Sequence, residues 1–142
     1  MSVEKISTIL TRINPFNMKK IIKAAKAPAA IGPYSQAVEI NNILYISGQI
    51  PIDPETGKLV AGDITVQTEQ VFKNIAAILE EAGYSFPDVV KSTCILSDIA
   101  NFKAMNEVYG RYYKEAQPAR SAFAARDLPM GALIEIESIA MK

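Results

Sequence analysis

This 142-residue chain has its clearest secondary-structure signals in residues 65–96, TVQTEQVFKNIAAILEEAGYSFPDVVKSTCIL. Apolar side chains recur at helical spacing in the first half, and Gly83 stands where a helix C-terminus favours glycine. The spacing therefore predicts a helix over 65–82. Residues 89–96 follow after a short turn and form a β-rich run, which predicts a strand.

On the N-terminal side the pattern changes to short apolar-rich segments that are typical of strands. Asn41 and Asn42 stand alone between two of these segments, and asparagine tolerates the positive φ angles that a tight hairpin requires. Residues 51–63 contain Pro54 and Gly57 and are expected to form a loop. The strands are expected at residues 19–24, 35–40 and 43–48.

On the C-terminal side a second helix is expected, with Asn101 as its N-cap and an end before Pro118. Residues 119–126 and 132–140 alternate like two strands, and the turn residues at 128–131 predict that they form a final hairpin. The order of elements is then β-ββ-α-β-α-ββ. This order predicts an α+β fold in which both helices cover one face of a mixed or antiparallel sheet.

Composition limits the chemistry of the chain. It is 49% hydrophobic and 21% charged, which is typical of one globular domain. Fifteen basic residues balance fifteen acidic ones, so non-specific nucleic-acid binding is not expected. The sequence has no histidine and one cysteine, which excludes a Ser-His-Asp triad, an imidazole metal ligand and an internal disulfide. No apolar run reaches membrane-spanning length, and we expect a cytoplasmic protein with no metal site.

Residues 1–26 hold six basic residues and one acidic residue, so the remaining nine basic and fourteen acidic residues leave the rest of the chain mildly acidic. Residues 1–17 are interpreted as an N-terminal extension, and residues 18–142 as a single domain. Residues 3–13 have the spacing of a short amphipathic helix. Three explanations of this segment stay open: an addition from cloning or an upstream start, a helix that packs on the domain, and an organelle leader.

The last two expected strands carry paired charges. Arg120 and Arg126 share one face of the first strand, and Glu135 and Glu137 share one face of the second, because successive side chains point to opposite faces. The predicted hairpin gathers these charges in one small region. Cross-strand ion pairing is one explanation. The other is a guanidinium that binds an anionic substrate beside a carboxylate that handles water or protons, and Pro118 favours it by stiffening the start of the strand.

Other polar candidates are weaker. Tyr34 follows a Gly-Pro turn, and Ser47 and Gly48 lie at a strand end, where a ligand can approach the backbone closely. Cys94 lies in an apolar run and is expected to be buried and inert. The glycines form no nucleotide-binding motif. A helical stripe is expected to contribute to the core or to a subunit interface, namely Tyr109, Tyr112 and Tyr113.

Taken together, the motifs resemble the reactive intermediate deaminase family, also called RidA or YjgF. The resemblance covers residues 18–142 and rests on six ordered segments. These segments are APAAIGPYSQ (27–36), SGQIP (47–51), NI with LEEAG (74–83), VKST (90–93), PARS (118–121) and IEIE (134–137).

This resemblance implies a chorismate-mutase-like α+β fold that assembles as a homotrimeric barrel, with sites between the subunits. It also implies hydrolysis of 2-imino and 2-enamino acids, such as 2-iminobutanoate and 2-iminopropanoate, to 2-oxo acids and ammonia without a cofactor. By the same resemblance Arg120 holds the substrate carboxylate and Glu135 positions the attacking water. Ala122 departs from members that have cysteine there. Further pocket-lining positions implied by the family are Tyr34, Ser47, Gly48 and Asn106.

Two other functions stay open on the sequence. A non-catalytic trimer of the same fold could bind small carboxylates or 2-oxo acids through the same arginine. A ribonuclease activity has been attached to some family members, but the lack of histidine and the acidic body of this chain argue against it. The expected partners are therefore a small imino or oxo acid and further copies of the chain, with no nucleic acid and no membrane.

Overall fold

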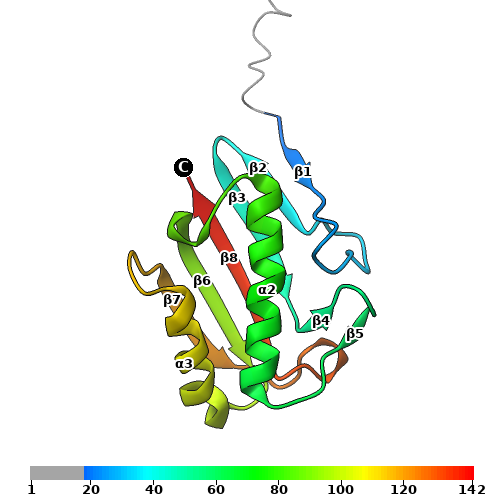
Figure 1. The fold of residues 1–142 in the computed structure, drawn as a ribbon, viewed down its shortest axis with the longest axis vertical. Coiled ribbons are helices and arrows are strands. Elements are labelled where there is room, and N and C mark those ends of the chain that lie inside the picture. Colours follow the sequence, from blue (N-terminus) through cyan, green and yellow to red (C-terminus); the bar gives the residue numbers. More distant parts are fainter. Residues whose placement is uncertain (1–17) are drawn as a thin grey trace, which may run out of the picture.

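The computed structural model describes residues 18–142, so the expected N-terminal extension and the helix predicted at 3–13 lie outside the described residues. Its centre is a six-stranded mixed sheet with the order β1-β2-β3-β8-β6-β7. Two helices, α2 (Ile64–Ala82) and α3 (Phe102–Tyr112), cover one face of this sheet (Figure 1), which confirms the α+β class. The strands are β1 (Lys20–Ile22), β2 (Ala37–Ile40), β3 (Ile43–Gln49), β6 (Val89–Leu96), β7 (Ala119–Ala124) and β8 (Ile134–Met141).

The local predictions around α2 and the first hairpin are confirmed. Gly83 ends α2 with a left-handed φ of 77°, and Asp63 begins the helix by accepting a hydrogen bond from the Val66 amide. Asn41 and Asn42 both adopt positive φ and join β2 to β3 in an antiparallel pair.

Two smaller predictions need correction. Asn101 makes no side-chain cap on α3; instead Asp98 accepts a hydrogen bond from the Ala100 amide and begins a 3-10 turn (Ile99–Asn101) that leads into the helix. The expected loop at 51–63 contains a short antiparallel pair, β4 (Ile52–Asp53) and β5 (Lys58–Leu59). Gly57, with a φ of 70°, makes the turn between them.

The predicted final hairpin is wrong. β7 pairs in parallel with β6, and β8 pairs antiparallel with both β3 and β6, so β6 separates the two strands. The physical reason lies in their burial. β8 buries Ile134 and Ile136 completely and takes a central position, whereas most of β7 is exposed or only half-buried, as is typical of an edge strand.

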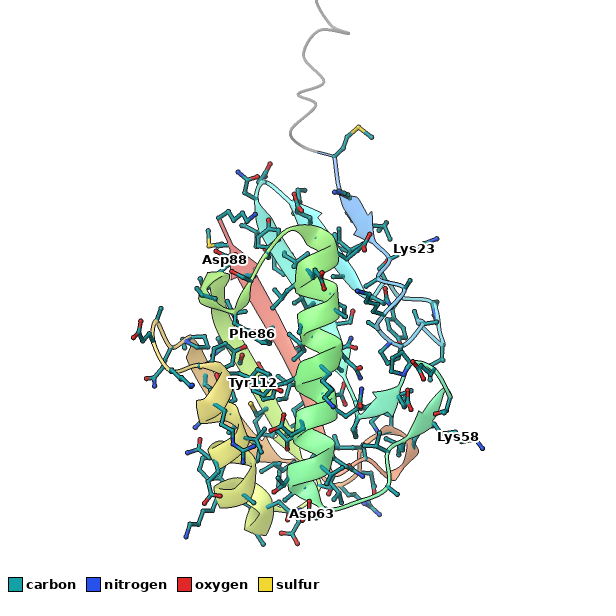
Figure 2. The ribbon with its side chains drawn as sticks, viewed as in Figure 1. Lys23, Lys58, Asp63, Phe86, Asp88 and Tyr112 are labelled. Carbon is teal, nitrogen blue, oxygen red and sulfur yellow. The ribbon has the colours of Figure 1, made fainter. Side chains whose placement is uncertain are left out.

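An aromatic cluster fills the space between the helices and the sheet. Phe72 of α2 stacks on Tyr112 of α3 with ring centroids 4.3 Å apart and an interplanar angle of 10°. Phe86 closes the cluster at 5.2 Å from the Tyr112 ring, and Figure 2 shows the two side chains beside α2. The predicted tyrosine stripe thus contributes to the core, with Tyr109 and Tyr113 buried.

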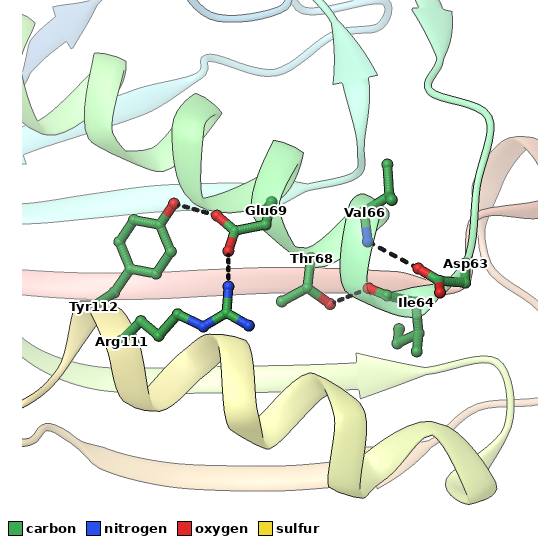
Figure 3. Close-up of polar contacts among 7 residues, drawn as sticks. All are labelled: Asp63, Ile64, Val66, Thr68, Glu69, Arg111 and Tyr112. Atoms are coloured by element: carbon green, nitrogen blue, oxygen red, sulfur yellow. Dashed lines mark hydrogen bonds and ion pairs between the residues drawn. The ribbon is translucent and has the colours of Figure 1, made fainter.

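Glu69 of α2 links the two helices through polar contacts. Its carboxylate accepts hydrogen bonds from the Arg111 guanidinium at 2.7 Å and from the Tyr112 hydroxyl at 2.6 Å (Figure 3). Burial, together with this carboxylate, raises the pKa of Tyr112 to about 12, so the phenol keeps its proton and remains a donor. The contact holds α3 at a fixed position along α2.

Candidate functional site

Arg120 is the centre of one cluster of polar and aromatic side chains at the edge of the sheet. Its Nη1 donates a hydrogen bond of 2.7 Å to Oδ1 of Asn106 on α3. The guanidinium carbon lies 4.5 Å from the ring centroid of Tyr109 and 5.5 Å from that of Phe102. We refer to these four residues as the arginine cluster. Because among residues 18–142 no carboxylate pairs with Arg120, its remaining N–H groups are available to an anion.

A hollow of about 380 Å³ opens beside the arginine cluster. Arg120, Asn106 and Tyr109 line one side of it, and the segment Gln117–Pro118 lines another. Proline at 118 restricts the backbone immediately before β7, as the sequence predicted. The hollow can therefore admit a small carboxylate to the free side of the guanidinium.

Glu135 is the centre of a second cluster, formed with Gly48 and Glu137. A Cβ added at Gly48 would lie 2.0 Å from Oε1 of Glu135, so the carboxylate occupies the space that a side chain at position 48 would need. Burial first, and the charge of Glu137 second, raise the pKa of Glu135 above its ordinary value. We refer to these three residues as the glutamate cluster. The carboxyl group of Glu135 is suited to exchanging protons with a bound water.

Tyr34 lies near the glutamate cluster on a tight turn, where its amide donates to the Gly32 carbonyl at 2.8 Å. Tyr34 and Gly48 line the same small hollow of about 30 Å³. Ser47 donates its hydroxyl to the Ser35 carbonyl at 2.6 Å and so ties this turn to β3. The structure therefore brings Tyr34, Ser47, Gly48 and Glu135 into one neighbourhood.

The two clusters lie on opposite faces of the sheet. Arg120 is in register with Ser92, which is buried under the helices, whereas Glu135 is in register with Ile95, whose side chain points the other way. The predicted gathering of arginines and glutamates in one region of the chain is therefore wrong, because it depended on the hairpin that does not form. Arg126 lies beyond the end of β7, and its side chain is 97% exposed beside Asp127.

The remaining candidates are placed as follows. Cys94 is fully buried, which confirms that part of the prediction, and burial raises the pKa of its thiol to about 11. Ala122 is in register with Cys94 on the helix-covered face. Within residues 18–142 no three His, Cys, Asp or Glu side chains come together as a metal site requires. Among the described residues no helix is long and apolar enough to cross a membrane.

Three buried amides support the site, and sequence analysis assigned no role to any of them. Gln36 fixes the segment before Tyr34 through hydrogen bonds to Ala24, Ala27 and Pro28. Asn74 of α2 donates to the carbonyls of Ile50 and Ile52, and Gln67 accepts from the Leu133 amide at 2.8 Å, just before β8. In a helix an amide is typical of the solvated face. Gln67 and Asn74 could still have been predicted as buried, because their spacing places them on the apolar side of α2.

The mixed sheet with two helices on one face places the chain in the class of small α+β proteins. Comparison with known families then identifies it further. The chain belongs to the family described as endoribonuclease L-PSP, whose model matches residues 24–142. This confirms the resemblance to the RidA and YjgF proteins.

Individual relatives agree with this assignment. The human 2-iminobutanoate/2-iminopropanoate deaminase is 47% identical over 125 residues, which is 88% of this chain and 91% of the human protein. The crystal structure of RidA from a Psychrobacter species is 49% identical, with a TM-score of 0.84 and coverage of 87% and 99% of the two chains. The structure of Escherichia coli TdcF with bound serine is 39% identical, with a TM-score of 0.82 and coverage of 87% and 98%.

Proposed function

We propose that this protein is a deaminase that hydrolyses 2-imino acids, such as 2-iminobutanoate and 2-iminopropanoate, to 2-oxo acids and ammonia without a cofactor. The observation that carries this proposal is the arginine cluster, which presents an unpaired guanidinium to a hollow sized for a small carboxylate. The human deaminase supports the reaction by its similarity, and TdcF with serine supports the binding of a small amino-acid-like carboxylate.

The reaction needs only a bound substrate, an oriented water and proton transfer, because an imine carbon is already electrophilic. Arg120 binds the substrate carboxylate through two N–H groups, while Asn106 holds the guanidinium in place. Glu135 orients a water toward C2 and accepts one of its protons as the C–O bond forms. Glu135 passes this proton to the imine nitrogen, which gives the carbinolamine. It then transfers the hydroxyl proton to the amino nitrogen as the C=O bond forms and the C–N bond breaks. One water is consumed, and one 2-oxo acid and one ammonia are released.

A site of this kind requires more than one copy of the chain. Arg120 and Glu135 occupy opposite faces of the same sheet, so one chain does not present both to one substrate. The bare face of the sheet also exposes three large apolar side chains, Tyr45, Phe123 and Met141, each 46–48% accessible, which a neighbouring copy would cover. We propose a homotrimer in which Arg120 of one subunit and Glu135 of the next complete each site.

The reaction is tested directly with the full chain. Threonine dehydratase generates 2-iminobutanoate in the cuvette, and semicarbazide traps the imine that escapes hydrolysis. Added protein should increase the yield of 2-oxobutanoate, Arg120→Ala should abolish the increase, and Arg126→Ala is the matched control because that arginine lies outside the cluster. A protein that binds 2-oxobutanoate but does not accelerate imine loss would instead be a non-catalytic binder.

The shared site is tested by mixing two inactive variants. Arg120→Ala subunits and Glu135→Gln subunits are each expected to be inactive alone. After denaturation together and refolding as an equal mixture, about one quarter of the sites combine an intact Arg120 with an intact Glu135 from its neighbour, so activity should return to about a quarter of the wild-type value. Mixed assemblies that remain inactive would contradict a site shared between subunits.

A further inference from the structure

Tyr109 is a buried aromatic residue that the reaction scheme above does not use. It lies on α3, three residues after Asn106, so both side chains face β7 from adjacent positions on the helix. The residue is 7% exposed, and its ring packs against the rings of Phe72 at 5.8 Å and Tyr113 at 4.7 Å. The ring is thus fixed on its core side and reaches the hollow of Arg120 on the other.

The guanidinium of Arg120 lies over this ring at 4.5 Å, which is within the range of a cation–π contact. The hydrogen bond to Asn106 fixes one nitrogen of the guanidinium but leaves rotation about that bond. A flat ring beneath the group restricts the rotation, because the planar guanidinium stacks on aromatic faces. Two contacts from one helix therefore define both the position and the plane of the fork that meets a carboxylate.

The hydroxyl of Tyr109 is buried close to Ser92 of β6 and makes no hydrogen bond of ordinary geometry to the described residues. Burial raises the pKa of this phenol, so the hydroxyl is neutral at physiological pH. The ring face, and not the hydroxyl, is the part of Tyr109 that contacts the Arg120 guanidinium.

We propose that Tyr109 is a positioning residue, whose ring face orients the Arg120 guanidinium for binding the carboxylate of the substrate. The inference rests on the proposed function for its substrate, but the contact that it describes is independent of turnover. It distinguishes Tyr109 from the other tyrosines of α3, because Tyr112 stacks on Phe72 and donates to Glu69 instead. Loss of the ring should weaken carboxylate binding, and loss of the hydroxyl should not.

The test compares Tyr109→Phe, Tyr109→Leu and a control, Tyr112→Leu, in the full chain. Two quantities are measured for each variant: the kcat and KM for 2-iminobutanoate, and the dissociation constant of 2-oxobutanoate from titration calorimetry. Tyr109→Leu should raise KM and the dissociation constant about tenfold, with a smaller effect on kcat. Tyr109→Phe should keep the wild-type values because it retains the ring. Tyr112→Leu should lower the unfolding temperature but leave both constants unchanged.

Unchanged binding in Tyr109→Leu would overturn the inference, and so would a loss in Tyr109→Phe as large as that in Tyr109→Leu. If Tyr112→Leu weakened binding equally, the effect of Tyr109 would be one of general packing, and the inference would fail. Wild-type protein that binds 2-oxobutanoate without hydrolysing the imine would refute the proposed function alone. In that case the dissociation constants still decide whether Tyr109 orients Arg120.

Discussion

Gly48→Ala should separate catalysis from binding more cleanly than removal of a charged residue. The φ angle of Gly48 is not among the positive ones, so its backbone accepts alanine. The added Cβ would lie 2.0 Å from Oε1 and 2.9 Å from Cδ of Glu135. Since ordinary contacts between carbon and oxygen are roughly 3.3 Å or longer, the carboxylate must move by more than about 1 Å. Displacement of a catalytic group by this distance lowers kcat about 100-fold.

The same substitution leaves the arginine cluster untouched, so KM should change little. Steady-state assays of imine hydrolysis give both constants, and thermal unfolding gives the stability. Gly57→Ala is the control: its Cβ meets nothing, but its φ of 70° makes alanine strained, so it should lower stability and retain kcat.

A double mutant identifies the cause of the loss. In a Glu135→Gln background the carboxylate is already absent, so adding Gly48→Ala should lower kcat little further. If the two substitutions instead lowered kcat by factors that multiply, Gly48 would affect catalysis by a route other than making space for Glu135. Wild-type kcat in Gly48→Ala would refute the reasoning outright.

Three further predictions follow from single contacts. Glu137→Gln removes a charge that raises the pKa of Glu135, so the acid limb of the pH profile of kcat/KM should move to lower pH. Gln36→Leu leaves several buried backbone groups without partners and should cost about 3 kcal/mol in denaturant unfolding. Glu69→Gln removes a charged acceptor and should cost about 1 kcal/mol, while a spectroscopic titration shows the pKa of Tyr112 falling from about 12.

Local patterns in the sequence predicted most elements of the fold, because periodicity and turn residues act over a few positions. The helix ending at Gly83 and the turn at Asn41 and Asn42 are examples. The pairing of β7 depends on a strand that is distant in the sequence, β6. Two adjacent strands with turn residues between them favour a hairpin, and the local pattern carries no information about whether β6 lies between them.

The candidate site shows the same division. Motifs singled out Arg120 and Glu135, but which face of the sheet each occupies depends on register with β6, which a strand's own alternation does not determine. The role of Gly48 could not be predicted from the sequence either. A glycine at a strand end has many explanations, and only the neighbouring strand shows that Glu135 fills the space above it.

The glutamate cluster is difficult to explain by stability alone. Because burial and Glu137 raise the pKa of Glu135, the folded chain binds its proton more tightly than the unfolded chain does. The stabilisation from this group is therefore present at low pH and is lost as the pH rises through the raised pKa, so the ionised carboxylate destabilises the fold at neutral pH. The chain also keeps glycine at position 48, where a side chain would displace that carboxylate. A destabilising charge held in a space that glycine provides is better explained by the chemistry of the site than by the requirements of folding.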